Sequence, residues 1–245
     1  MQRLDGLRVL VSGGASEIGS QVVRSLVEQG ASVVAVDSTA ERIDGAIASL
    51  GLDDPDEIFT QALDATDLAS WWDLANLVTS YHHSLDLFVH VAEPRPGKPA
   101  LELGIDEFRQ AQATSLESFL MAVARLQRPL IEAGKESAEG ACVIAISPPS
   151  ANGPTPGLPN VAMRASVVAM VETMAHEFSD EGLNIRVNAI QPGRGDAGEA
   201  ARAAASAVID LVSESGRSIN GRELRLDAGD RAGSGCNAGK GDRDE

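Results

Sequence analysis

The sequence predicts a single α/β domain built on a Rossmann-like, doubly wound parallel sheet of about seven strands. Short, continuous apolar runs alternate with longer stretches of helical periodicity along the chain. Such apolar runs are typical of strands that helices cover on both faces, as in a parallel sheet. Right-handed crossovers between the strands then wind the sheet in both directions from its centre.

The strand-like runs follow one another at residues 8–12, 31–37, 58–63, 85–92, 141–147, 185–191 and 223–227. Helical patterns separate them at residues 18–29, 40–50, 105–131 and 161–181, and again just before the last strand. A chain of 245 residues fits one such domain, which we assign to residues 1–229. Residues 230–245 are rich in glycine and charge and have little to bury, so we expect a disordered tail.

Composition excludes several classes of function. The net charge of −16 argues against nucleic acid as a partner, because a polyanion would be repelled. No window approaches the length of a membrane span, and the first residues lead directly into a strand without room for a signal peptide. The two cysteines, Cys142 and Cys236, are compatible with a reducing compartment. We therefore expect a cytoplasmic protein with no membrane partner.

A glycine-containing turn follows the first strand and reads SGGASEIG from Ser12 to Gly19. In a βαβ unit such a turn presents backbone N–H groups and a helix N-terminus to a pyrophosphate. Gly13 and Gly19 are the glycines on which this geometry depends. Asp37 ends the second strand, where dinucleotide-binding folds place an acid for the ribose hydroxyls.

Three ordered motifs resemble the short-chain dehydrogenase/reductase family. The turn at residues 12–19 is similar to the family's TGxxxGIG, residues 184–193 (NIRVNAIQPG) resemble its IRVNAxxPG run, and residues 220–229 resemble its closing segment. The resemblance covers nearly the whole chain. It implies NAD as the cofactor, an adenine-flanking role for Asp64, and catalysis by a tyrosine, a lysine, a serine and an asparagine.

All four catalytic positions of that family are changed here. The asparagine position falls on Ser115, the serine position on Pro148, the tyrosine position on Asn160 and the lysine position on Arg164. An amide has no proton to exchange near neutral pH, and arginine does not replace lysine at a fitted site. We therefore predict that this chain has no catalytic residues of the family's kind; nothing in the sequence indicates a metal site.

The nucleotide site is altered too. Glu17 replaces the middle glycine of the turn, and Glu93 replaces the last glycine of the family's NNAG motif, so each adds bulk and negative charge beside the expected cofactor. Glu17 either points into solvent or accepts the N–H groups that a phosphate would take. Gly13, Gly19, Asp37 and Asp64 are then vestigial, the two acids being equally interpretable as solvated strand ends. We expect no cofactor in this chain.

Other residues offer a rebuilt site. His90 ends the fourth strand, and Ser147 or Ser150 could take the serine role beside Arg164. A histidine at a strand end is more often structural, and the only tyrosine, Tyr81, lies before the fourth strand. The helical lid that the family carries before its last helix is also missing, because Gly193 leads almost directly into Gly198.

Three functions fit these observations. The first is a non-catalytic subunit that pairs with an active, NAD-dependent paralogue in a hetero-oligomer. Because members of the family usually assemble as dimers and tetramers, we expect a tetramer. Apolar segments at 119–123 and 167–171 would serve assembly, or are ordinary core. Such pairing resembles the hydroxyacyl-CoA-type dehydrogenases of anaerobic toluene breakdown. The second is an active oxidoreductase with a rebuilt site, and the third is a dinucleotide or acyl-CoA sensor without chemistry. The changed positions favour the first.

Overall fold

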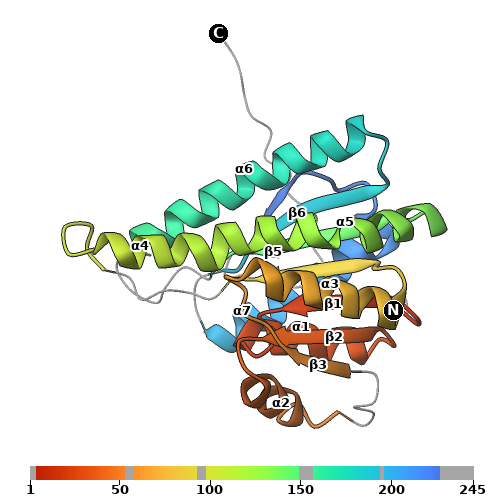
Figure 1. Ribbon diagram of the computed structural model, residues 1–245, viewed down its shortest axis with the longest axis horizontal. Helices are drawn as coiled ribbons and strands as arrows, with labels where there is room; N and C mark the ends of the chain where they lie inside the picture. Colours follow the sequence, from red (N-terminus) through yellow and green to blue (C-terminus); the bar gives the residue numbers. More distant parts are fainter. Residues whose placement is uncertain (1–3, 53–57, 93–97, 149–156, 194–195, 227–245) are drawn as a thin grey trace.

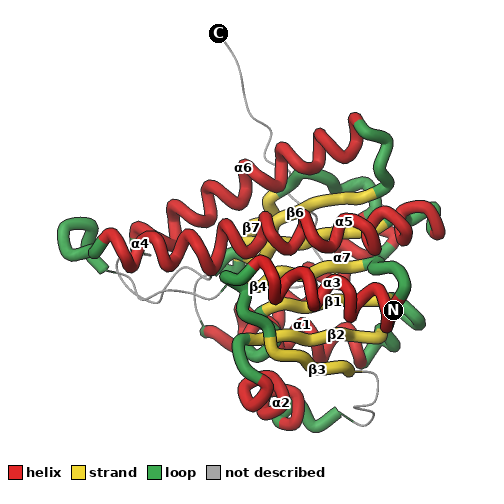
Figure 2. The backbone as a smooth tube through the Cα atoms, in the orientation of Figure 1, coloured by secondary structure: helices red, strands yellow, loops and turns green. Residues whose placement is uncertain are grey.

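The computed structural model describes residues 4–52, 58–92, 98–148, 157–193 and 196–226. Seven parallel strands form one sheet in the order β3-β2-β1-β4-β5-β6-β7, and Figure 2 shows them side by side from β3 at one edge to β7 at the other. The strands are β1 (Arg8–Ser12), β2 (Ser32–Asp37), β3 (Ile58–Ala62), β4 (Leu87–Val91), β5 (Ala141–Ile146), β6 (Ile185–Gln191) and β7 (Glu223–Arg225). The predicted fold class is confirmed.

Helices cover both faces of the sheet (Figure 1). One face packs against α3 (Leu68–His82), α5 (Ser118–Glu136) and α6 (Leu158–Asp180), through buried side chains such as Trp71, Phe119 and Val171. The other face packs against α1 (Glu17–Val27), α2 (Ala40–Ala48) and α7 (Ala197–Val212). Both faces of the strands are therefore apolar, which is why the sequence shows continuous rather than alternating runs.

The chain reverses its winding between β1 and β4, which are neighbours in the sheet although β2 and β3 separate them in sequence. Val9 lies opposite Val33 of β2 and opposite Leu87 of β4. In such sheets ligands bind outside the carboxyl ends of the strands at this reversal. Ser12, Asp37 and Val91 end their strands there, so the expected nucleotide site lies at this edge.

The long helix predicted for residues 105–131 is interrupted. It consists of α4 (Ile105–Gln112), a π-helical turn (Ala113–Glu117) and α5, which continues to Glu136. The extra residue of a π turn cannot be read from an apolar pattern that stays in phase with a helix, and such turns are frequent at functional sites. Ser115, at the asparagine position, lies in this turn.

Other predicted boundaries differ little from those observed. The last strand is shorter than the predicted 223–227, and a 3-10 turn (Glu214–Gly216) follows α7. Within the described residues no helix is long and apolar enough to cross a membrane. The tail predicted for 230–245, together with Glu93, Ser150 and Cys236, lies outside the described residues.

Candidate functional site

The glycine turn after β1 has the close packing that its sequence predicts. Gly13 has a φ of +75°, and a Cβ added to it would lie 2.4 Å from the carbonyl oxygen of Val91 on β4. A Cβ on Gly19 would lie 2.1 Å from the carbonyl oxygen of Gly13. Side chains are therefore excluded at both positions, and the strand, the turn and the helix approach one another as in a dinucleotide-binding unit.

Several N–H groups of this turn, those of Gly14, Ala15, Ser16 and Gly19, have acceptors within the chain. The N–H of Ala15 donates to Oδ2 of Asp37 over 3.0 Å, and the N–H of Gly19 donates to Oγ of Ser16 over 3.0 Å. Ser16 is also the N-cap of α1. A phosphate at this turn would have to displace protein acceptors to gain these hydrogen bonds.

Asp37 is fully engaged. Its second oxygen, Oδ1, accepts the N–H of Ser38 at 2.8 Å and forms an ion pair with Nε of Arg42 at 2.9 Å. The residue is only 7% exposed. The carboxylate expected to bind ribose hydroxyls thus ties β2 to the glycine turn and to the start of α2.

Glu17 is the first residue of α1 and its side chain is exposed. Its Oε1 lies 3.8 Å from the place that a Cβ on Gly198 would occupy, in the first turn of α7. Among the described residues Glu17 accepts no N–H group of the turn, and Asp37 and Ser16 accept two of them. The negative charge still lies at the helix N-terminus where a pyrophosphate would bind.

Asp64, expected beside the adenine, is an exposed carboxylate at the end of β3. Its Oδ1 accepts the N–H and the hydroxyl of Thr66 at 2.9 and 2.7 Å. This is an Asx turn that leads the chain toward α3, so the structure gives the residue a local role.

Arg164, at the lysine position on α6, is directed toward the ends of the last two strands. Its Nη1 donates to Oε1 of Gln191 over 2.5 Å and lies 3.2 Å from Oε1 of Glu223. The Glu223 side chain is only 10% exposed and also forms an ion pair with Arg225. The guanidinium therefore clamps α6 to β6 and β7.

The other three catalytic positions are buried. Asn160 lies in the first turn of α6 at 6% exposure, Ser115 is 3% exposed in the π turn, and Pro148 follows β5. None of these side chains carries a group that titrates near neutral pH. These three positions therefore hold none of the tyrosine, serine and asparagine side chains that the family's reaction uses.

His90 is a structural link rather than an exposed acid–base group. Its Nδ1 lies 2.8 Å from Oγ of Ser12 on β1, and its Nε2 lies 3.3 Å from Oγ of Ser118 on α5. The side chain is almost completely buried, and this burial lowers its pKa to about 4. The imidazole is neutral at pH 7 and joins β1, β4 and α5.

The remaining candidates for a rebuilt site do not converge on it. The hydroxyl of Ser147 donates to the carbonyl oxygen of Ile190 at 3.2 Å and is buried. Tyr81 lies on the outer side of α3, where its ring packs 5.5 Å from that of Phe59. Within the described residues, no group of three or more His, Cys, Asp or Glu side chains is placed to hold a metal ion.

The connection between β6 and α7, where the sequence predicts that a lid is missing, is short. β6 ends at Gln191 and α7 begins at Ala197, with Asp196 accepting the N–H of Glu199 as its N-cap. In the part that the structure describes, this connection has no helix before α7.

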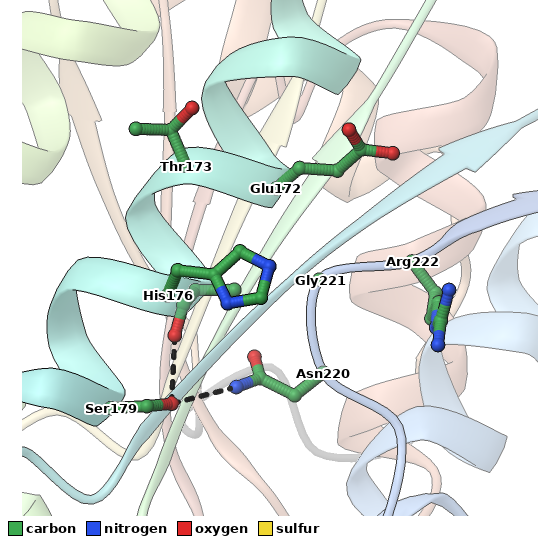
Figure 3. A pocket seen from close by; sticks show the side chains of 8 residues that line it. Glu172, Thr173, His176, Ser179, Asn220, Gly221 and Arg222 are labelled. Carbon is green, nitrogen blue, oxygen red and sulfur yellow. Dashed lines mark hydrogen bonds between the residues drawn. The ribbon is translucent and has the colours of Figure 1, made fainter.

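A surface pocket of about 460 Å³ lies away from these residues, between the second half of α6 and the loop that leads into β7 (Figure 3). It is lined by Glu172, Thr173, Ala175, His176, Ser179, Asn220, Gly221 and Arg222. The amide of Asn220 donates to Oγ of Ser179 at its base. The pocket contains none of the predicted site residues.

The residues that pair with Arg164 and Asp37 were not predicted from the sequence. Gln191 and Glu223 lie 27 and 59 residues from Arg164, so spacing gives no sign of the clamp. The available signal was chemical: a half-buried arginine requires a carboxylate, and Glu223 stands in a strand next to the expected site. For Asp37, the nearby Arg42 one helical turn into α2 was a similar signal.

Comparison with known proteins agrees with this fold. The family model described as short chain dehydrogenase matches residues 8–206. The chain is 29% identical to D-threitol dehydrogenase of Mycolicibacterium smegmatis, over 93% of this chain and 94% of that protein. It is 31% identical to 2,5-dichloro-2,5-cyclohexadiene-1,4-diol dehydrogenase LinX of Sphingobium indicum, over 78% of this chain and 74% of that protein.

Among solved structures, a 3-ketoacyl-(acyl-carrier-protein) reductase from Brucella melitensis complexed with NADH superposes with a TM-score of 0.79. The two are 21% identical, and the match covers 92% of this chain and 98% of the reductase chain. At that identity the likeness concerns the fold alone. With the strand order, the glycine turn and the family match taken together, the chain belongs to the short-chain dehydrogenase family of oxidoreductases.

Proposed function

We propose that this chain is a non-catalytic subunit of a heteromeric short-chain dehydrogenase, in which it stabilises an active, NAD-dependent paralogue. The observation that carries the proposal is the clamp of Arg164. At the position where the family keeps a lysine for tyrosine and cofactor, the guanidinium is committed to Gln191 and Glu223. The tyrosine position, Asn160, holds a buried amide with no proton to exchange.

The nucleotide site supports the same proposal. Asp37 is engaged with Ala15, Ser38 and Arg42, and Glu17 adds a negative charge at the N-terminus of α1. Binding a dinucleotide would require breaking the bonds of Asp37 and accepting a carboxylate beside a pyrophosphate. NAD therefore belongs to the active partner, and this chain works without a cofactor.

The helices at the surface support assembly. The eight large hydrophobic side chains that are exposed among the described residues all belong to α3, α4, α5, α6 or the turn before α4: Leu68, Trp72, Tyr81, Leu101, Ile105, Leu120, Leu158 and Val161. Phe119, Val167 and Val171, from the two predicted assembly segments, are core. An apolar surface confined to one layer is typical of an interface.

For the substrate, we propose a hydroxyacyl or ketoacyl compound that the partner oxidises or reduces. The arrangement would parallel the hydroxyacyl-CoA-type dehydrogenases of anaerobic toluene breakdown, in which an inactive subunit accompanies an active one. The named relatives of this chain are dehydrogenases of diols and polyols, which favours an alcohol–carbonyl interconversion in the complex.

Those relatives also favour a competing function, an active oxidoreductase with a rebuilt site. His90 and Ser147 are buried and hydrogen-bonded, which weighs against it. The test is to purify the chain and measure NADH binding by fluorescence and NAD reduction with alcohol and 3-hydroxyacyl-CoA substrates. The proposal predicts neither. Turnover would establish the rebuilt site, and nucleotide binding without turnover would establish a sensor.

A further inference from the structure

One part of the exposed apolar surface combines hydrophobic and cationic side chains. α3 and α5 lie side by side on the same face of the sheet (Figure 1). Leu68 and Trp72 are one turn apart on α3 and are 44% and 55% exposed. Beside them, α5 carries Arg125 and, three residues later, the exposed Arg128. We call these four residues the Trp72 patch.

Arg125 stacks on Trp72 and, among the described residues, has no carboxylate partner. Its guanidinium carbon lies 5.2 Å from the ring centre of Trp72, a cation–π arrangement. Its Nε is buried and has no hydrogen-bond acceptor. Within the part of the chain that the structure describes, no carboxylate forms an ion pair with Arg125 or Arg128, although acidic residues outnumber basic ones by 36 to 20. The patch is therefore a local excess of positive charge on an acidic protein.

We propose that the Trp72 patch is a docking surface for the partner subunit, which places an apolar side chain on Trp72 and a carboxylate against Arg125. The inference rests on the function proposed above and specifies the chemistry of the partner. Tryptophan and arginine are the residues that most often dominate protein interfaces. A partner's carboxylate would pair with the charged guanidinium of Arg125 and with the exposed Arg128 one turn along α5.

Charge decides between a different partner and a second copy of this chain. Each copy carries a net charge of −16, so self-association would bring two strongly acidic molecules together. A partner with a lower negative charge overall and a local acidic group opposite α5 avoids that repulsion. Nucleic acid is disfavoured by the same net charge.

The test uses the tagged full-length chain and the subunit that co-purifies with it from the native host, with affinity measured on the reconstituted pair. Trp72→Ala and Arg125→Glu should each weaken the complex about thirtyfold, because each removes a central contact. Tyr81→Ala is the matched control. Tyr81 is an exposed aromatic residue on the same helix, 47% exposed, but it packs against Phe59 outside the patch. It should change the affinity less than twofold.

A photo-crosslinking amino acid at position 72 identifies what covers the patch. The crosslink should reach a partner segment containing Asp or Glu, and replacing that acid by Arg should restore binding to the Arg125→Glu variant. A complex that survives Trp72→Ala and Arg125→Glu unchanged overturns the docking site but leaves the proposed function standing. A crosslink to a second copy, or a chain that forms no heteromer, overturns the inference; the latter also overturns the proposed function.

Discussion

At the scale of single residues, two acidic side chains, Asp37 and Glu17, lie at the glycine turn. Gly13 and Gly19 keep the backbone close to β4, so the framework of the turn is intact. Asp37 has taken the N–H of Ala15 for itself, and Glu17 brings a charge to the start of α1. The turn keeps the shape of a dinucleotide site, and Glu17 adds negative charge where a diphosphate would bind.

Replacing Glu17 by glycine should therefore raise the affinity for NADH. Two unit charges about 4 Å apart interact by about 4 kcal/mol at an effective dielectric near 20, and solvent exposure of Glu17 reduces this, so we expect a gain of roughly tenfold. Titration of NADH fluorescence measures it. Glu17→Gln, which removes the charge and keeps the bulk, should recover most of the gain. Equal, unmeasurable affinities for both variants would show that Glu17 is not what excludes the nucleotide.

Sequence alone could predict the positions of these residues but not their hydrogen bonds. The motif at 12–19 placed Gly13 and Gly19 correctly because both are dictated by local backbone geometry. Whether Asp37 faces a ribose or the chain itself depends on where the N–H of Ala15 lies, 22 residues away. Glu17 could point two ways because an exposed side chain at a helix start has no packing to fix it.

At the scale of elements, the position of the catalytic lysine has become a structural joint. β7 is only three residues long and pairs with β6 at one edge of the sheet. Arg164 reaches it from α6 and joins three elements through Gln191 and Glu223. The arginine at this position therefore has a structural role in joining α6 to the end of the sheet.

Truncating this joint should destabilise the protein. Arg164→Ala leaves the largely buried Glu223 with only the exposed Arg225, and we expect a loss of about 1–3 kcal/mol in the free energy of unfolding. Arg225→Ala is the control, because that side chain is 66% exposed and its ion pair should contribute less than about 1 kcal/mol. Urea denaturation of these variants, of Glu223→Gln and of Arg164→Ala/Glu223→Gln measures the coupling energy between Arg164 and Glu223. Equal losses for the two single variants would contradict the clamp.

His90 joins elements in a similar way and makes stability depend on pH. Its pKa falls from 6.5 to about 4 on folding, so the unfolded chain binds a proton more readily than the native protein. Stability is therefore fully present above about pH 6.5 and is lost as the pH falls toward 4. The loss from this residue alone is at most about 3.4 kcal/mol, at 1.36 kcal/mol per pKa unit.

Unfolding free energies measured between pH 7.5 and 4.5 test this expectation. His90→Asn removes the titrating group, so its stability should decline less over this range than that of the unaltered protein. Some slope should remain, because burial also lowers the pKa of His82 to about 4. An unchanged pH slope in His90→Asn would show that His90 does not titrate with unfolding.

The sequence predicts whether a segment is a helix or a strand more readily than it predicts a π turn inside a helix or the length of an edge strand. The apolar runs of β1, β4 and β5 are buried on both faces and could be recognised from composition alone. The π turn at Ala113–Glu117 could not, because α4 and α5 together present one continuous helical pattern. Likewise the short β7 depends on pairing with β6, which a local pattern does not reveal.

At the scale of the whole molecule, the sheet, its two helical layers and the glycine turn are those of the family. The positions where the family keeps its tyrosine and lysine hold the buried amide of Asn160 and Arg164, which is paired with Glu223. On these two observations we propose that the chain keeps the fold without the reaction. The large exposed apolar side chains of the described residues lie on α3, α4, α5, α6 and the turn before α4, and we propose this layer as the surface that binds another subunit.

Native mass spectrometry of the tagged chain purified from its own host tests whether the chain is a non-catalytic subunit of a heteromeric dehydrogenase. We expect a heteromer of fixed stoichiometry whose second subunit carries tyrosine and lysine at the positions equivalent to Asn160 and Arg164. Changing that tyrosine in the partner should abolish turnover, whereas changing Asn160 should not affect it. A pure homo-oligomer, or a monomer, that oxidises an alcohol with NAD by itself would contradict the proposed role as a non-catalytic subunit.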